Sequence, residues 1–405
     1  MAPLHLDCKI KMLTISDYPL EPHYPETEDG YILTLYRLNI NPPISTSGEN
    51  NEDEVSELKT SDRPPVLLVH GMMCAGTEWL CNSPEKVLPY MLYEQGYDCW
   101  IGCLRGTRLT GAKPHVKYTM KQKKYWDFSV DEFGYYDVPA MIDYILEVTH
   151  HENLFYVGHS LGATSVIITL SSRPEYNDKI RACAAMTPAI YGEHCRNFFL
   201  TKLSAPLYAV FAKSRFFYRR GVCQSSLVEL VKKYWPCMPR KDKICSKLFR
   251  FYTQSILKII YKKQLEKERL PQLVEILPGQ SSMKMVCQVM QCLFYKKAQA
   301  YDYGRNGNMK KYGQSTPPRY NLENVTAPMA LYSSDHDYLV GHEDVLRLSN
   351  ELKNVIKYKK IVGKFYHTDF MIGSDAHKLL YPDVIQVFDK FKLADSAGNN
   401  ISTKL

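Results

Sequence analysis

The sequence lacks any long uninterrupted apolar run. No stretch of about 18 apolar residues, the length at which a segment is taken as a membrane-spanning candidate, occurs in the 405 residues. The first thirty residues hold no apolar segment of signal-peptide length either, because Asp7, Lys9, Lys11 and Asp17 interrupt each candidate. The sequence as written therefore predicts a soluble chain with no transmembrane segment and no export signal of its own.

Cysteine patterns typical of metal or redox sites are also missing. The 12 cysteines form no C-x-x-C pair, and they are too dilute for a disulfide scaffold. The nearest approaches, Cys99 with Cys103 and Cys287 with Cys292, have no histidine at metal-ligand spacing. We expect buried free thiols rather than metal ligands, and no metal or organic cofactor. The redox compartment stays open.

Acidic residues are scarce in one part of the chain. The formal net charge is +8, and between Arg196 and Arg269 about eighteen basic residues face only Glu229, Asp242, Glu266 and Glu268. A solvated helical face, an anionic lipid surface or nucleic acid could each explain this excess. No recognised nucleic-acid-binding motif accompanies the charge, so we expect no nucleic-acid partner.

Short apolar strands alternate with helical patterns along the rest of the chain. Strands are predicted in residues 64–71, 97–105, 152–157, 179–188, 325–334 and 356–364, with a hairpin in 29–40, and helices in 83–95 and 131–148. Strands that are apolar on both faces and alternate with helices indicate a parallel sheet wrapped by helices. Residues 191–298 look helical and contain no clear strand. We therefore predict an α/β domain in two parts, 1–190 and 299–395, interrupted by a helical cap at 191–298 and followed by a tail at 396–405.

Three predicted strand ends carry the side chains of an acyl-transfer triad. The strand LFYV leads into Gly158-His159-Ser160-Leu161-Gly162, a G-x-S-x-G elbow in which a strained turn exposes the serine hydroxyl. A later strand ends at Asp335 and Asp337, and another precedes His367. A serine needs a histidine to accept its proton and a carboxylate to orient that histidine. The order Ser, Asp, His along the chain is the order of the α/β-hydrolase fold.

An acyl transfer also needs donors for the oxyanion. The elbow geometry offers the backbone amide of Leu161, and the loop after the first long strand offers the amide of Met72. His70 and His159 are predicted to be structural. Among the remaining histidines, His377 is a distant second choice for the base.

Several long motifs together resemble the acid lipases, a family that includes the gastric and lysosomal lipases and their insect relatives. They are TEDGYILTLYRL (27–38), LLVHGMM (67–73), WIGCLRG (100–106), KYWDFSVDEFGYYDVPAMIDYIL (124–146), GHSLG (158–162), KAQAYDYG (297–304), PPRYNLENVTAP (317–328) and FYHTDF (365–370). The resemblance covers residues 12–392 and implies the α/β-hydrolase fold. By motif matching it implies Ser160 as nucleophile, Asp337 rather than Asp335 as acid, His367 as base, and the oxyanion amides of Met72 and Leu161.

The resemblance implies an activity and a setting. The expected reaction is hydrolysis of carboxylic esters of lipids, triacylglycerols or sterol esters, beneath the cap, which could contact a lipid surface peripherally. A secreted or lysosomal location is implied, so the missing signal peptide indicates an incomplete N-terminus or an intracellular variant. Glycosylation would then use Asn324 or Asn400. The family's glutamine after the serine is Leu161 here, and the asparagine of its G-N-x-R-G loop is Cys103.

Two other functions remain open at this point. A general carboxylesterase acting on soluble esters would use the same three side chains. A catalytically silent lipid-binding or carrier protein could keep the fold without the reaction, although the presence of all three strand-end groups argues against it.

Overall fold

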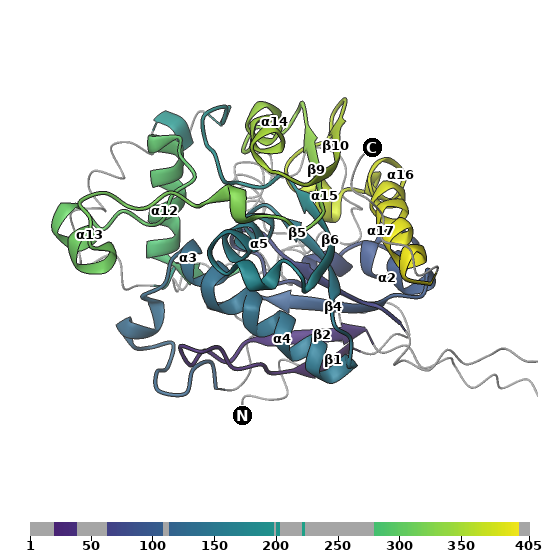
Figure 1. Ribbon diagram of the computed structural model, residues 1–405, viewed down its shortest axis with the longest axis horizontal. Helices are drawn as coiled ribbons and strands as arrows, with labels where there is room; N and C mark the ends of the chain where they lie inside the picture. Colours follow the sequence, from purple (N-terminus) through teal and green to yellow (C-terminus); the bar gives the residue numbers. More distant parts are fainter. Residues whose placement is uncertain are drawn as a thin grey trace, which may run out of the picture.

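A mixed β-sheet forms the centre of the protein (Figure 1). The computed structural model describes residues 20–38, 63–107, 113–197, 200–202, 221–222 and 279–396. Its main sheet has eight strands in the order β1-β2-β4-β3-β5-β6-β9-β10. The strands are β1 (Leu20–His23), β2 (Thr34–Leu38), β3 (Pro65–Val69), β4 (Asp98–Cys103), β5 (Leu154–His159), β6 (Ile180–Met186), β9 (Met329–Ser334) and β10 (Val355–Ile361). The six strands from β4 to β10 run parallel, and β2 and β1 extend the sheet in antiparallel pairing.

Helices cover both faces of the sheet (Figure 1), which is why its inner strands are apolar on both sides. On one face, Leu67 and Tyr156 pack in a core that includes α4 (Val138–Thr149) and α5 (Leu161–Ser172). On the other face, Leu68 and Phe155 pack with α2 (Leu88–Glu94) and α17 (Tyr381–Ser396). The α/β architecture predicted from the alternating pattern is therefore confirmed.

The predicted turn at Asp29-Gly30 is confirmed. The Thr27 amide donates to the Tyr31 carbonyl at 2.8 Å, and Gly30 has a φ of 90° that favours glycine. The helix predicted at 131–148 forms as α3 (Val130–Glu132), a π-helical turn at Phe133–Asp137 and then α4. Its π turn places Asp137 at the side of Arg105, an arrangement that the helical periodicity does not indicate.

Only parts of the predicted cap lie within the described residues. They include the two-residue strands β7 (Gly221–Val222) and β8 (Ser281–Ser282), which pair antiparallel, and α12 (Met283–Tyr295). The expectation that 191–298 contains no strand was therefore wrong at this point. Residues 203–220 and 223–278 lie outside the described part, so the cap and its bounds stay a prediction.

The remaining helices follow the cap segment along the chain. They are α13 (Arg305–Tyr312), α14 (His342–Glu351), α15 (Asp369–Ile372) and α16 (Ala376–Leu379). Among the helices in the described ranges, none has both the length and the apolar character needed to cross a bilayer.

Candidate active site

Ser160 stands on a strained turn between β5 and α5. Its φ of 52° and ψ of −114° lie in a region that a residue with a side chain rarely adopts. The turn is held because the Ser160 amide donates to the Met186 carbonyl at 2.9 Å and the Ser160 carbonyl accepts from the Thr164 amide, also at 2.9 Å. The strand-to-helix elbow predicted from G-x-S-x-G is present.

The two glycines of the elbow are required by sterics. A Cβ on Gly158 would lie 2.6 Å from the backbone nitrogen of Ala163, and a Cβ on Gly162 would lie 2.4 Å from the Val69 carbonyl oxygen. Both contacts are with backbone atoms, which cannot turn aside as a flexible side chain could. The elbow therefore packs β5, α5 and the end of β3 closer together than any other residue type permits.

Asp337 and His367 meet beside this elbow. Asp337 follows β9, His367 lies in the loop between β10 and α15, and His367 Nδ1 is 2.7 Å from Asp337 Oδ2. An ionised carboxylate only accepts hydrogen bonds, so Nδ1 carries the proton and Nε2 is left as the basic nitrogen. Of the two aspartates that the strand-end pattern offered, only Asp337 contacts the histidine. Asp335 instead pairs with His336 and accepts from the Gly363 amide.

The surroundings of Asp337 favour its charged form. Burial by itself would raise the pKa of the Asp337 carboxyl, but His367, the Thr187 hydroxyl and the Val340 amide together hold that pKa below its usual value. Thr187 Oγ1 donates to Asp337 Oδ2 at 2.6 Å. The sequence interpretation missed Thr187, although its position directly after β6 is the strand-end position that identified the aspartate.

His159 connects the elbow to the histidine loop. Its Nε2 lies 2.7 Å from the His367 carbonyl oxygen, and the two rings lie 4.8 Å apart. A carbonyl only accepts, so Nε2 of His159 carries the proton. Burial, with the nearby His367, lowers the pKa of His159 to about 3, which keeps its ring neutral above that pH. The contact agrees with the structural role predicted for His159.

The loop after β3 approaches Ser160 closely. A Cβ on Gly71 would lie 3.1 Å from the Cβ of Ser160. Both ring nitrogens of His70 are occupied by backbone groups, since Nδ1 donates to the Gly71 carbonyl at 2.8 Å and Nε2 accepts from the Leu104 amide at 3.1 Å. This pairing needs a neutral ring, and burial lowers the pKa of His70 to about 4. Met72 follows in the same loop and is partly exposed.

A buried ion cluster supports the far side of this loop. Arg105, which comes after β4, is 1% exposed, and its Nε contacts Asp137 Oδ1 at 2.7 Å. Its two terminal nitrogens contact the carboxylate of Asp29 at 2.5 and 2.8 Å, and its guanidinium lies 3.9 Å from the centre of the Tyr31 ring. Burial disfavours the charge on Arg105, but the two carboxylates outweigh it and raise its pKa further. The sequence interpretation did not find this cluster, because its members lie far apart in the chain.

A small pocket lies next to the elbow, between α5 and α12. Its walls are mostly apolar in area. The apolar side chains are Val130, Leu161, Ile168, Ala189, Ile190 and Val289, and the others are Thr164, Gln288, Cys292, Lys297, Gln299 and Tyr320. Leu161 belongs both to this wall and to the proposed oxyanion pair. The pocket therefore lies beside the residue that directly follows Ser160.

Other candidate residues lie away from the site. His377 belongs to α16 and His342 begins α14, and within the described ranges neither forms a hydrogen bond or ion pair with Ser160 or Asp337. The predicted free thiols are confirmed, since Cys99, Cys103 and Cys287 are buried and Cys292 is half-buried, all without disulfides. The side-chain nitrogen of the glycosylation candidate Asn324 donates to the Ser171 carbonyl at 2.9 Å, whereas Asn400 lies outside the described residues.

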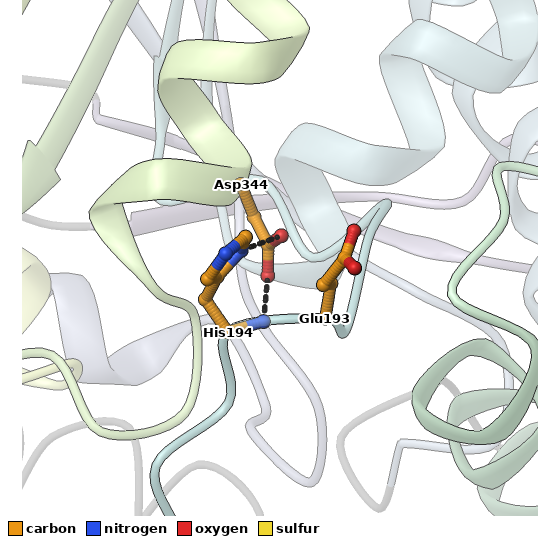
Figure 2. A group of neighbouring side chains, drawn as sticks. All are labelled: Glu193, His194 and Asp344. Carbon is orange, nitrogen blue, oxygen red and sulfur yellow. Dashed lines mark hydrogen bonds and ion pairs between the residues drawn. The ribbon is translucent and has the colours of Figure 1, made fainter.

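One cluster in the described part of the chain has metal-ligand side chains. Glu193, His194 and Asp344 bring ligand atoms within 4.8 Å of one another (Figure 2). His194 Nδ1 and the His194 amide contact the two oxygens of Asp344 at 2.8 and 3.0 Å. Both oxygens of the buried carboxylate are therefore already engaged by one residue.

Comparison with known proteins gives consistent matches. A family model described as "alpha/beta hydrolase fold" matches residues 64–374, and one described as "partial alpha/beta-hydrolase lipase region" matches residues 10–83. Lipase 3 of Drosophila melanogaster is 32% identical, with 93% of this chain and 91% of that protein covered.

Two vertebrate relatives extend the comparison. Gastric triacylglycerol lipase of Bos taurus is 31% identical over 94% of this chain and 91% of its own length. A putative lysosomal acid lipase/cholesteryl ester hydrolase of Crotalus adamanteus is 29% identical over 95% of this chain and 91% of its own. The long motifs had indicated the same group of proteins. The chain belongs to the acid lipase family of α/β hydrolases.

Proposed function

We propose that the protein hydrolyses carboxylic esters of lipids, triacylglycerols or sterol esters, through an acyl-enzyme on Ser160. The observation that carries the proposal is the 2.7 Å contact between His367 Nδ1 and Asp337 Oδ2, next to a serine on a strained elbow. That contact leaves Nε2 of His367 as the free base. Membership of the acid lipase family supports lipid esters as the substrate class.

The reaction assigns one task to each side chain. His367 Nε2 takes the proton of the Ser160 hydroxyl as its oxygen attacks the ester carbonyl, and the ring then carries a positive charge that Asp337 stabilises. The tetrahedral intermediate collapses when His367 gives that proton to the departing alcohol. Water, deprotonated by the same histidine, then attacks the acyl-enzyme and releases the fatty acid.

The negative charge on the carbonyl oxygen needs fixed donors during both steps. We assign this role to the backbone amides of Met72 and Leu161. The close approach of Gly71 to Ser160 and the position of Leu161 directly after the nucleophile support the assignment. Each donor of this kind contributes roughly 3 kcal/mol to transition-state stabilisation.

The apolar pocket beside Leu161 supports a substrate with an apolar portion. The proposed cap at 191–298 would cover this side and could touch a lipid surface with its basic residues, most of which lie outside the described ranges. A secreted or lysosomal setting follows as a proposal from the relatives named gastric and lysosomal. A carboxylesterase of soluble esters is the second candidate, because the triad alone does not distinguish the two.

The experiment compares turnover of the same acyl ester when dissolved and when emulsified. A lipase gains rate at the emulsion, and a soluble-ester carboxylesterase does not. Ser160→Ala should abolish both activities, whereas Ser172→Ala, a serine at the other end of α5, should keep them. Retained hydrolysis in Ser160→Ala would show that the nucleophile is elsewhere, and a folded wild-type protein inactive on every ester would favour the lipid-carrier alternative.

A further inference from the structure

The segment Glu193–Arg196 runs along the loop that carries Asp337. We call residues 335–341, between β9 and α14, the acid loop. We propose that residues 193–196 hold the acid loop in place and that His194 is a positioning residue for Asp337. The inference rests on the proposed function, since it assumes that Asp337 serves His367 in catalysis.

On its inner side, the acid loop folds around the Asp337 carboxylate. Oδ1 of Asp337 accepts from the amides of Leu339 and Val340 at 2.9 and 3.0 Å. Oδ2 faces the other way, toward His367. The backbone of the loop and the carboxylate are therefore joined, and a shift of the backbone moves the oxygen that orients the base.

On its outer side, the loop is tied to the 193–196 segment. The Arg196 amide donates to the Tyr338 carbonyl at 2.9 Å, and Tyr338 directly follows Asp337. The Arg196 side chain donates to the Asp335 carbonyl at 3.3 Å and pairs with Glu343 at 2.5 Å. Arg196 thus contacts the acid loop on both sides of Asp337, and it also contacts α14.

His194, which is itself exposed, connects the segment to a buried carboxylate (Figure 2). Its ring and its amide occupy both oxygens of Asp344, which lies in the first turn of α14 and is 1% exposed. Gly341, the last residue of the acid loop, lies so close that a Cβ there would be 2.5 Å from the Cβ of His194. Asp344 and Gly341 together hold the end of the loop against His194.

The charges around the cluster favour this positioning role over a metal site. Glu193, the third residue with ligand atoms, lies 3.4 Å from Nη1 of Arg347 and 4.0 Å from Nζ of Lys296. Two cationic side chains would repel a metal ion at that carboxylate. The contact between His194 Nδ1 and Asp344 Oδ1 at 2.8 Å satisfies the carboxylate without any ion.

The test uses two variants of equal shape. In His194→Asn the amide nitrogen stands where Nδ1 stood and can still donate to Asp344, whereas His194→Leu has the same outline and no donor. We expect His194→Leu to lower kcat roughly ten-fold at unchanged KM, because misplacing a catalytic group by about 1 Å can cost as much as 100-fold. His194→Asn should stay within about two-fold of the wild type. Lys179→Met, at an exposed ion pair with Asp143, is the control and should leave kcat unchanged.

Hydrogen exchange provides a readout that does not depend on activity. Amides of residues 337–341 should exchange faster in His194→Leu than in the wild type, while those of β5 should not change. Unchanged exchange in the acid loop would overturn the inference even if the wild type proved inactive. A loss of thermal stability with unaltered kcat per active site would overturn it as well. Added Zn²⁺ that stabilises the wild type but not His194→Leu would assign the cluster to a metal instead.

Discussion

The carbonyl oxygen of His367 accepts a hydrogen bond from Nε2 of His159, the residue directly before the proposed nucleophile Ser160. His367, the proposed base, is therefore held at two points, through its ring by Asp337 and through its backbone by the elbow. This contact ties the His367 loop to the elbow independently of the Asp337 carboxylate. It also explains why a buried histidine stands inside the elbow.

Replacing His159 should separate packing from hydrogen bonding. His159→Phe keeps a ring against His367 and Phe370 but removes the donor, so we expect kcat to fall by roughly ten-fold as the histidine loop loses its tie to the elbow. His159→Gln can place an amide nitrogen near the same carbonyl and should recover part of the rate. Steady-state kinetics normalised to active sites measure kcat for each variant. Equal kcat in His159→Phe and the wild type would show that the contact is dispensable.

The elbow glycines should tolerate no side chain. In Gly162→Ala the new methyl would meet the carbonyl oxygens of Val69 and His70 at 2.4 and 2.7 Å, so we expect about 3 kcal/mol or more of lost unfolding free energy. Gly304→Ala is the comparison, because at a φ of 75° its methyl meets no atom within 4 Å and should cost only about 1 kcal/mol. Denaturant titration measures both, and similar losses would contradict the steric account.

Asp369 should make stability depend on pH. Burial, with the charges of Asp337 and Asp375, raises the pKa of its carboxyl to about 7. A carboxyl with a raised folded-state pKa contributes stability that is fully present below its unfolded value, about 4, and is lost as pH rises through about 7. Asp369→Asn keeps an acceptor for the Tyr366 amide without the charge.

As pH rises, the wild type loses at most about 4 kcal/mol of unfolding free energy through Asp369. This bound corresponds to a difference of about three between the folded-state and unfolded-state pKa values. The stability of Asp369→Asn relative to the wild type should therefore increase between pH 4 and pH 8. Urea unfolding at four or five pH values measures this difference. A constant difference across that range would contradict a raised pKa for the Asp369 carboxyl.

Arg105 should not be replaceable by lysine. Its guanidinium reaches Asp137 and Asp29 at once, and a single ammonium cannot, so Arg105→Lys leaves one of the two carboxylates without a charged partner. We expect a loss of about 2 kcal/mol, below the value for a fully buried ion pair, because the Arg105 amide and the Thr27 hydroxyl still donate to Asp137 and Asp29. The matched variant Arg173→Lys should lose less than about 1 kcal/mol of unfolding free energy, because the partners of Arg173, Glu28 and Glu175, are exposed. Comparable losses in thermal unfolding would contradict the burial argument.

The sequence predicted the elbow and the aspartate–histidine partners because local signals mark them. Gly158 and Gly162 flank Ser160 at fixed spacing, and Asp337 and His367 follow strands whose apolar residues are visible in the chain. The choice between Asp335 and Asp337 could not be made from the strand pattern, since both follow β9. Only the family motifs and then the contact between Asp337 and His367 separated them.

Contacts between distant segments could not be predicted in this way. Thr187, Arg105 and His194 each act through a partner more than thirty residues away, and no periodicity or turn signal links the two. The π turn at Phe133–Asp137 was not predicted either, because its residues also fit an ordinary helix. Burial and the need to pair charges determine these positions, and both depend on the assembled fold.

The central claim is that Ser160 is a nucleophile activated by His367, and one covalent-labelling experiment tests it most directly. The folded protein is treated with an active-site-directed fluorophosphonate, and the modified peptide is identified by mass spectrometry. We predict one adduct, on Ser160, that is lost in His367→Ala and strongly slowed in Asp337→Asn. A folded wild-type protein that stays unlabelled, or that is labelled equally in His367→Ala, would contradict the account.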